Sequence, residues 1–160
     1  MKTLRVMLAF LTIAFVITAA TGARSQAPKG LEGTWRLNVL KSKFSPGPAP
    51  KSMTVAYSAV GTTGMRIVVD LVPADGAAQH WEVTAHYDGK DHPVVGNPNA
   101  DMITMKRIDD RIGESTFKKD GKVTSTNRRT LSADGKTLTI TSSGTTADGK
   151  PRKDVQVFEK

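Results

Sequence analysis

The 160-residue sequence contains no cysteine. This absence excludes disulfide bridges, thiolate metal sites, cysteine nucleophiles and a lipidated cysteine at a signal cleavage site. Aromatic residues are scarce, with two Trp, two Tyr and five Phe, and no segment shows the periodicity of an amphipathic helix. The length is that of one domain. With 24% charged and 38% hydrophobic residues, the composition is typical of neither a disordered chain nor a chain that is membrane-spanning throughout.

Catalytic motifs are also missing from the sequence. It has no Gly-x-Ser-x-Gly, no phosphate-binding loop and no dinucleotide fingerprint. The adjacent carboxylates Asp109 and Asp110 precede Arg111 in an expected hairpin turn, whereas a general acid needs a buried or coupled carboxyl group. We therefore predict that the protein is not an enzyme, with no catalytic residues and no cofactor.

The three histidines could bind a metal only if the fold brought them together. His80 and His86 share a strand face but lie about 20 Å apart at about 3.3 Å per residue. His86 and His92 flank the turn at residues 88–91 and could approach across a hairpin, with Asp91 as a third ligand. The favoured interpretation is histidines exposed beside a turn, and no metal site is predicted.

The N-terminus has the pattern of a secretory signal peptide. Lys2 and Arg5 precede an apolar run from Val6 to Ala20, and small residues follow at positions 21–23. The apolar run is shorter than the about 20 residues that span a bilayer. We predict a signal peptide at residues 1–23, a linker at 24–30 and one folded domain at 31–160. The protein is then exported, periplasmic or extracellular, and meets a membrane only through the signal peptide.

The basic charge is spread along the chain. Without residues 1–23, the formal charge falls from +8 to +6, because 21 basic and 15 acidic residues remain. Nucleic-acid binding would favour a basic patch interleaved with aromatic residues, and only Phe117 accompanies the one dense basic group. We predict a solvated pair of strands and no nucleic-acid partner. The basic group comprises Lys118, Lys119, Lys122, Arg128 and Arg129.

Turn signals separate short runs rich in Val, Ile and Thr. Asp-Gly pairs at 75–76, 88–89, 120–121, 134–135 and 148–149 favour tight hairpin turns, and the proline-rich residues 45–50 predict a loop after the first strand. The pattern predicts an all-β fold, an antiparallel up-and-down meander of about 8–10 strands that closes into a barrel. The expected strands are 32–39, 52–60, 64–72, 78–87, 92–95, 101–108, 111–119, 122–132, 136–144 and 152–159.

Alternation along these strands predicts the inner wall. Trp81, Val83, Ala85 and Tyr87 alternate with polar residues, so their face points inward. The same holds for Met53, Val55 and Tyr57 and for Ile67, Val69 and Leu71, while residues 123–131 present a mixed face of Val123, Ser125, Asn127, Arg129 and Leu131. If the barrel has a pocket, we predict that its wall includes Tyr57, Val69, Trp81, Tyr87 and Arg129.

Arg129 could supply a contact for an anionic group. An inward arginine is costly unless it is paired or faces a wet cavity. The alternative is that Arg128 points inward, because a one-residue bulge reverses every assignment along a strand.

Several segments resemble known small barrels. Gly33-Thr34-Trp35 opens the first strand, as Gly-x-Trp does in lipocalins and Gly-Thr-Trp in intracellular fatty-acid-binding proteins, and residues 155–160 resemble the closing strand of the latter. Residues 41–50 and 87–101 look like exported bacterial proteins of lipocalin-like type. The resemblance covers nearly the whole mature chain. It implies a lipocalin-like, calycin-type barrel over residues 31–160, whose known members mostly bind small apolar molecules.

The sequence departs from fatty-acid-binding proteins in its last strand. Fatty-acid-binding proteins hold a carboxylate with Arg-x-Tyr in the last strand, and this chain has Gln156 and Phe158 there. In lipocalins a late basic residue covers the first-strand Trp, and Arg128, Arg129 and Arg152 are the candidates here. We expect Trp35 to plug the closed end of the barrel rather than to contact ligand.

Two functional hypotheses lead from this point. The first is an exported lipocalin-like domain that binds a small apolar or amphipathic ligand. The second is a ligand-free structural or interaction barrel in the cell envelope, filled by its own side chains. An enzyme of unknown type is a third hypothesis, which the sequence favours less than these two. The sequence does not indicate an oligomeric state.

Overall fold

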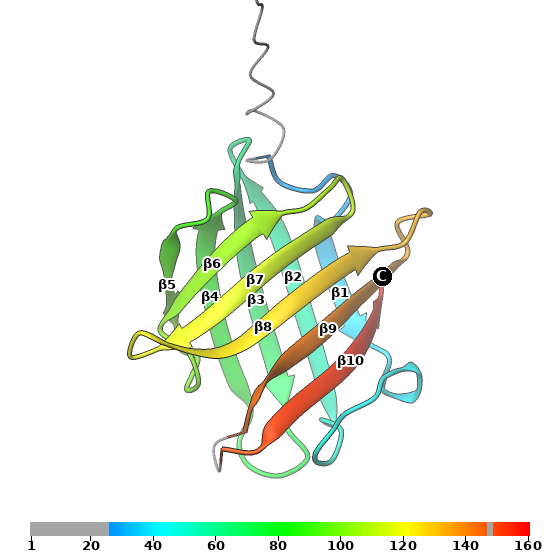
Figure 1. The fold of residues 1–160 in the computed structure, drawn as a ribbon. Coiled ribbons are helices and arrows are strands. Elements are labelled where there is room, and N and C mark those ends of the chain that lie inside the picture. Colours follow the sequence, from blue (N-terminus) through cyan, green and yellow to red (C-terminus); the bar gives the residue numbers. More distant parts are fainter. Residues whose placement is uncertain (1–25, 147–148) are drawn as a thin grey trace, which may run out of the picture.

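Ten antiparallel strands form a closed barrel in the computed structural model, which describes residues 26–146 and 149–160 (Figure 1). Each strand pairs with the next along the chain, and the first pairs with the last. The predicted all-β, up-and-down barrel is confirmed. The elements are β1 (Gly33–Leu37), the short 3-10 helix η1 (Val39–Lys41), β2 (Ser52–Val60), β3 (Gly64–Val72), β4 (Gln79–His86), β5 (Asp91–Val95), β6 (Met102–Arg107), β7 (Ile112–Lys119), β8 (Lys122–Leu131), β9 (Thr137–Thr145) and β10 (Pro151–Glu159).

Tight turns fix the register of the hairpins. Asp120 and Gly121 join β7 to β8 with φ angles of 50° and 73°, a left-handed pair that Asp-Gly adopts at low cost. The β2–β3 hairpin pairs Val60 with Gly64, as its predicted strands imply. The first strand is shorter than expected, because Asn38 leaves the ladder and its side chain caps η1 by accepting a hydrogen bond from the Lys41 amide at 3.2 Å.

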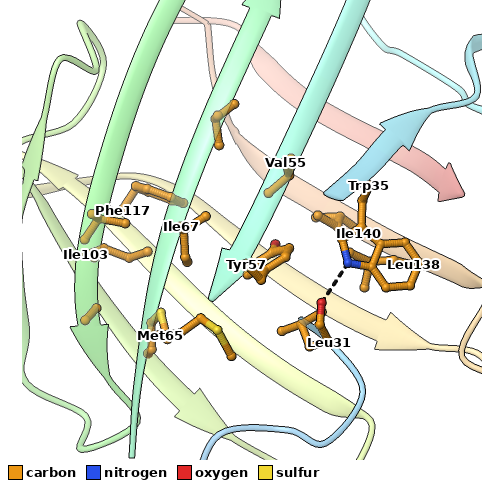
Figure 2. Packing of buried hydrophobic residues seen from close by; sticks show 14 of the residues in the cluster. Leu31, Trp35, Val55, Tyr57, Met65, Ile67, Ile103, Phe117, Leu138 and Ile140 are labelled. Atoms are coloured by element: carbon orange, nitrogen blue, oxygen red, sulfur yellow. Dashed lines mark hydrogen bonds between the residues drawn. The ribbon is translucent and has the colours of Figure 1, made fainter. Parts of the chain in front are cut away.

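The apolar half of the interior is built by alternate residues of neighbouring strands. Trp35 lies opposite Val55, Val55 opposite Val69, and Val69 opposite Trp81. The first three of these side chains are fully or almost fully buried. Figure 2 shows how residues from strands far apart in the sequence meet in this core. The inward direction predicted for the alternating faces of β2, β3 and β4 is therefore confirmed.

A β-bulge in β8 changes which side chains at the start of this strand face inward. Phe117 pairs with Ser125 but Lys118 pairs with Val123, so Thr124 is the extra residue. Because one extra residue reverses the side-chain direction, Val123 points outward and is 59% exposed. The prediction that Val123 shares the inner face was wrong. Residues from Ser125 onward lie beyond the bulge and keep their predicted direction.

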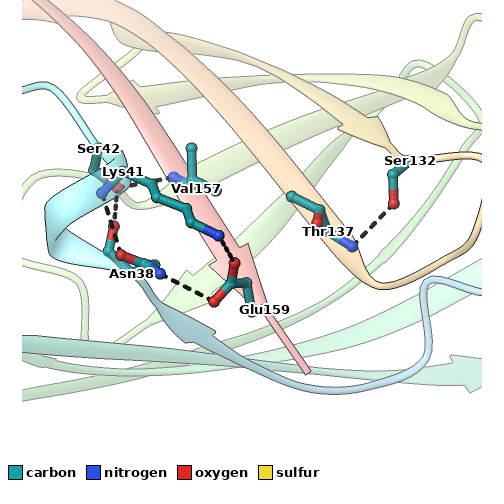
Figure 3. Close-up of polar contacts among 7 residues, drawn as sticks. All are labelled: Asn38, Lys41, Ser42, Ser132, Thr137, Val157 and Glu159. Atoms are coloured by element: carbon teal, nitrogen blue, oxygen red, sulfur yellow. Dashed lines mark hydrogen bonds and ion pairs between the residues drawn. The ribbon is translucent and has the colours of Figure 1, made fainter.

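The barrel closes through a short ladder that side chains reinforce. β1 and β10 share only the pairs Arg36–Glu159 and Leu37–Phe158, with a further bridge between Lys43 and Val155. Beside this ladder, the Glu159 carboxylate accepts hydrogen bonds from Asn38 Nδ2 at 3.0 Å and Lys41 Nζ at 2.6 Å (Figure 3). The polar groups that follow β1 thus hold the last strand in place.

Residues 26–32 close one end of the barrel over Trp35. Ala27 donates its amide to Thr62 O at 3.2 Å, and Leu31 is buried. Trp35 Nε1 donates to the Leu31 carbonyl at 2.7 Å (Figure 2). The basic group over the Trp35 ring is Lys160, whose Nζ lies 4.7 Å from the ring centroid.

The basic residue that covers Trp35 is not one of those expected from the sequence. Arg128, Arg129 and Arg152 were the candidates, but Arg128 pairs with Glu114, Arg129 lies against two tyrosines and Arg152 pairs with Asp154. Lys160 reaches Trp35 because β10 ends at Glu159, which pairs with Arg36, the residue after Trp35. The expected plug position of Trp35, with no exposed surface, is confirmed.

The predicted signal peptide at residues 1–23 lies outside the described residues, and export stays a prediction. Within residues 26–146 and 149–160, no helix has the length and apolar character needed to cross a membrane.

Candidate ligand cavity

Buried polar side chains gather on one side of the barrel wall. Within the part of the chain that the structure describes, all the buried polar or charged residues belong to β7, β8, β9 or β10. The opposite wall, from β2 to β6, is lined by apolar side chains and Tyr57. The interior is therefore amphipathic. The buried polar residues are Ser115, Arg129, Ser142, Asp154 and Gln156.

A cavity of about 50 Å³ lies between these two walls. Trp81 and Phe117 form part of its apolar lining, with their rings edge to face at a centroid distance of 5.7 Å. An apolar cavity of about 150 Å³ holds benzene, so this cavity has room for a few water-sized groups. Its polar lining consists of Tyr57, Ser115, Asn127, Arg129 and Gln156.

Arg129 is the most unusual group in the cavity wall. Its side chain is buried, with the residue 5% exposed. One terminal nitrogen, Nη2, donates to Tyr87 Oη at 3.4 Å, and the guanidinium carbon lies 5.9 Å from the Tyr57 ring centroid and 6.0 Å from that of Tyr87. Nε is buried without a hydrogen-bond partner. The guanidinium is thus held between two phenol rings and is left with donor capacity.

Arg129 is a charged group in a buried position beside two tyrosines. Burial opposes the charge on Arg129, but the nearby Tyr87 and Tyr57 phenols outweigh it and hold the arginine pKa above its ordinary value. Burial in turn raises the pKa of Tyr57, against the opposing effect of the Arg129 charge. At neutral pH the site therefore presents a buried cation beside the neutral phenol of Tyr57.

Gly113 makes room for the guanidinium. This residue pairs with Arg129 across β7 and β8. A Cβ atom at position 113 would lie 3.2 Å from Arg129 Nη2, which is a tight contact, and 3.6 Å from Tyr87 Cε1, which is an ordinary van der Waals contact. The missing side chain allows Arg129 to pack beside Tyr87.

A second pocket, the mouth pocket, opens at the opposite end of the barrel from Trp35. It measures about 250 Å³ and is lined by the proline-rich loop after β1, the end of β3 and the start of β10. Asp154 in its wall is satisfied, because its carboxylate accepts from Arg152 Nε at 2.8 Å and from the Ser45 amide at 3.1 Å. Gln156 lines both this pocket and the inner cavity, so one side chain stands between them.

Four of the five predicted site residues line the inner cavity. They are Tyr57, Val69, Trp81 and Arg129. Tyr87 is buried outside the lining and contacts the cavity through Arg129. The alternative inward residue, Arg128, instead points outward and pairs with Glu114 at 2.5 Å.

The polar residues of the mouth and of β7 were not predicted as site residues. Alternation along residues 111–119 places Gly113, Ser115 and Phe117 on one face and was a usable signal for the last two. Gln156 was considered only because it stands where the Arg-x-Tyr pattern has its arginine. No sequence pattern indicated that the proline-rich loop would form a pocket wall.

The histidine cluster lies away from the cavity. The His86 and His92 rings approach to 5.5 Å between centroids, which is the approach that the hairpin allowed, but neither ring lines the cavity. His92 Nε2 lies 2.9 Å from Asp88 Oδ1, whereas Asp91 pairs with Lys118 at 2.8 Å. Among the described residues, no group of three or more His, Asp or Glu side chains is arranged to hold a metal ion.

Comparison with known proteins provides a structural likeness only. No family model matches the chain, and no curated protein matches it. Among solved structures, the chain is similar to mFAP1, described as a redesigned β-barrel bound to DFHBI. The two are 17% identical, the match covers 85% of this chain and 100% of that chain, and the TM-score is 0.47.

Proposed function

We propose that the protein is an exported, lipocalin-like barrel that binds a small amphipathic ligand through its mouth pocket. The observation that carries the proposal is the shared wall at Gln156, which separates a surface pocket from a mostly apolar inner cavity whose polar groups, apart from Tyr57, come from β7, β8 and β10. Ligand sites are typically concave, mostly apolar and equipped with a few placed polar groups. The interior of this barrel has that composition.

The volumes limit the size of the ligand. The inner cavity of about 50 Å³ and the mouth pocket of about 250 Å³ together reach only the lower end of the ~300–1,000 Å³ range of small-molecule sites. A ligand that occupies both pockets has one end beside the polar groups of the inner cavity. The rest of it extends past Gln156 toward the proline-rich loop. A short chain or a single ring fits this description.

Binding without catalysis is the activity that the contacts support. The Asp154 carboxylate in the mouth pocket is engaged by Arg152 and Ser45. A general base needs to lie within hydrogen-bond reach of the proton it takes, and His86 and His92 line neither of the two pockets. Export is proposed from the basic, apolar and small-residue pattern of residues 1–23.

A ligand-free structural barrel is the second candidate. The small volume of the inner cavity favours it, because the side chains of the ten strands already fill most of the interior. Small barrels are stable when packed in this way.

Tryptophan fluorescence separates the two candidates. The chain has two tryptophans, of which Trp81 lines the cavity and Trp35 does not. In a Trp35→Phe variant, Trp81 is the sole reporter. We expect native mass spectrometry of the protein from its own host to show a co-purifying small molecule, and we expect that molecule to change Trp81 fluorescence saturably.

A blocking variant checks the route to the cavity. Gln156→Phe fills the junction between the two pockets and should weaken the fluorescence response, while His80→Phe, on the exposed face of β4 and outside both pockets, should leave it unchanged. A protein without any co-purifying molecule, whose Trp81 fluorescence also responds to no small amphiphile, would instead support the ligand-free barrel.

A further inference from the structure

We propose that Arg129, held between Tyr57 and Tyr87, forms an anion site that takes the carboxylate of the ligand. This inference rests on the proposed function and names the class of ligand, a small carboxylic acid with an apolar body. It starts from a buried cation that has no counter-ion within the described residues.

The donor geometry indicates a planar anion. A guanidinium carries five N–H donors in a fixed fork, and pairs best with a carboxylate through two parallel hydrogen bonds. In Arg129, Nη2 is shared with Tyr87 Oη at 3.4 Å, which is long for a hydrogen bond. Nε has no partner. The group is therefore under-satisfied in a place where an unpaired donor is expensive.

The acidic side chains nearest along the strands have other partners. Glu114 faces outward and binds Arg128 at 2.5 Å. Asp154, on the polar wall, binds Arg152 at 2.8 Å. Arg128 and Arg152 are thus each paired with a carboxylate. Arg129, which lines the cavity, has no such partner among the described residues.

The cavity provides room and further polar contacts at the same place. Arg129, Tyr57, Ser115 and Asn127 all line the space of about 50 Å³. This volume suits a carboxylate group but not a long chain, so the rest of the ligand must follow the apolar wall toward Gln156. The hydroxyl and amide groups of Ser115 and Asn127 can donate to the outer carboxylate oxygen.

Gly113 supports the same interpretation. Its missing side chain leaves the space that Arg129 Nη2 occupies, 3.2 Å from where a Cβ would lie. The φ angle of Gly113 is not in the left-handed region, so the backbone does not require glycine. The residue is explained by the room it gives the arginine.

The test compares a carboxylic acid with its neutral amide. Hexanoate and hexanamide differ in charge but hardly in shape, and their dissociation constants for the full folded domain can be measured at pH 7 in low chloride by calorimetry. We expect hexanoate to bind at least about tenfold more tightly, since hydrogen bonds to charged groups are the stronger ones. The Arg129→Gln variant should lose this preference. Arg128→Gln, the neighbouring arginine on the outer face, should keep it.

A second variant keeps the test decisive if Arg129→Gln fails to fold. Gly113→Ala retains the arginine but displaces its guanidinium, and we expect it to lower the preference for hexanoate several-fold. Equal affinity of the wild type for hexanoate and hexanamide would overturn the anion site and leave the proposed function standing. An unchanged preference in Arg129→Gln would also overturn it. Failure of both compounds, and of the co-purified molecule, to bind would overturn both proposals.

Discussion

Replacement of Trp35 by alanine should destabilise the barrel strongly and leave ligand affinity unchanged. The side chain has no exposed surface, and truncation of a buried Trp typically costs about 3–5 kcal/mol through lost transfer energy and the residual cavity. Two local contacts add to the loss. The Leu31 carbonyl loses its donor at 2.7 Å, and Lys160 Nζ loses the ring 4.7 Å below it.

Milder variants separate these contributions. Trp35→Phe keeps an aromatic ring but removes the indole N–H, and leaving the Leu31 carbonyl unpaired costs about 1–3 kcal/mol. Lys160→Met removes the cation, which is worth about 0.5–1 kcal/mol at an exposed site. Combining Lys160→Met with Trp35→Ala, which removes the ring, in a double-mutant cycle shows whether the cation and the ring interact directly.

Urea unfolding followed by circular dichroism measures these changes, and titration of the co-purified ligand measures affinity on the same samples. Trp35 does not line the cavity, so only the unfolding midpoint should move. A Trp35→Ala variant that loses less than about 1 kcal/mol, or that loses ligand affinity at unchanged stability, would refute the plug role.

Two further predictions concern particular contacts, and a third concerns the N-terminal sequence pattern. Gly144→Ala should destabilise by about 1–3 kcal/mol or more, because its Cβ would lie 2.3 Å from the Thr124 carbonyl at the β8 bulge, whereas Ser143→Ala on the exposed side of β9 should be nearly neutral in the same urea experiment. The Lys41 and Asn38 side chains lower the pKa of Glu159. The ionised carboxylate therefore stabilises the fold at pH values above the ordinary glutamate pKa of 4.5, and this stabilisation is lost as the pH falls through the lowered pKa. Glu159→Gln should thus reduce the melting temperature at pH 7 and make little difference at a pH well below the lowered pKa. Export should remove residues 1–23, give or take a few, and N-terminal mass analysis of protein from the cell envelope that found Met1 intact would contradict the signal peptide.

The strands were predictable because two local signals agree throughout the chain. Expected strand 64–72 matches the bounds of β3, and 52–60 those of β2, since glycine-containing turns and period-two alternation both mark these ends. The inward direction of Arg129 was predictable for the same reason. Alternation from Ser125 to Leu131 is unbroken, and the bulge at Thr124 lies before it.

Long-range contacts were beyond the reach of local patterns. The direction of Val123 depends on how β8 meets β7, and the cover of Trp35 depends on where β10 ends. Cavity volume depends on the packing of side chains from many strands, so alternation could identify Tyr57 and Trp81 as wall residues without giving the size of the space. The mouth pocket is formed by an irregular loop, which has no periodicity to analyse.

The pairing of β1 with β10 has a consequence for how the chain folds. The residues that meet in the pairs Arg36–Glu159 and Leu37–Phe158 are separated by nearly the whole domain. Contacts of such sequence separation carry a large loop-closure entropy and form late in folding. Before β10 arrives, β1 and β9 each present an unpaired edge that can join another chain. A chain that is synthesised from its N-terminus therefore cannot close this barrel until β10 is released. Truncation before Pro151 is expected to yield aggregates rather than a nine-strand barrel.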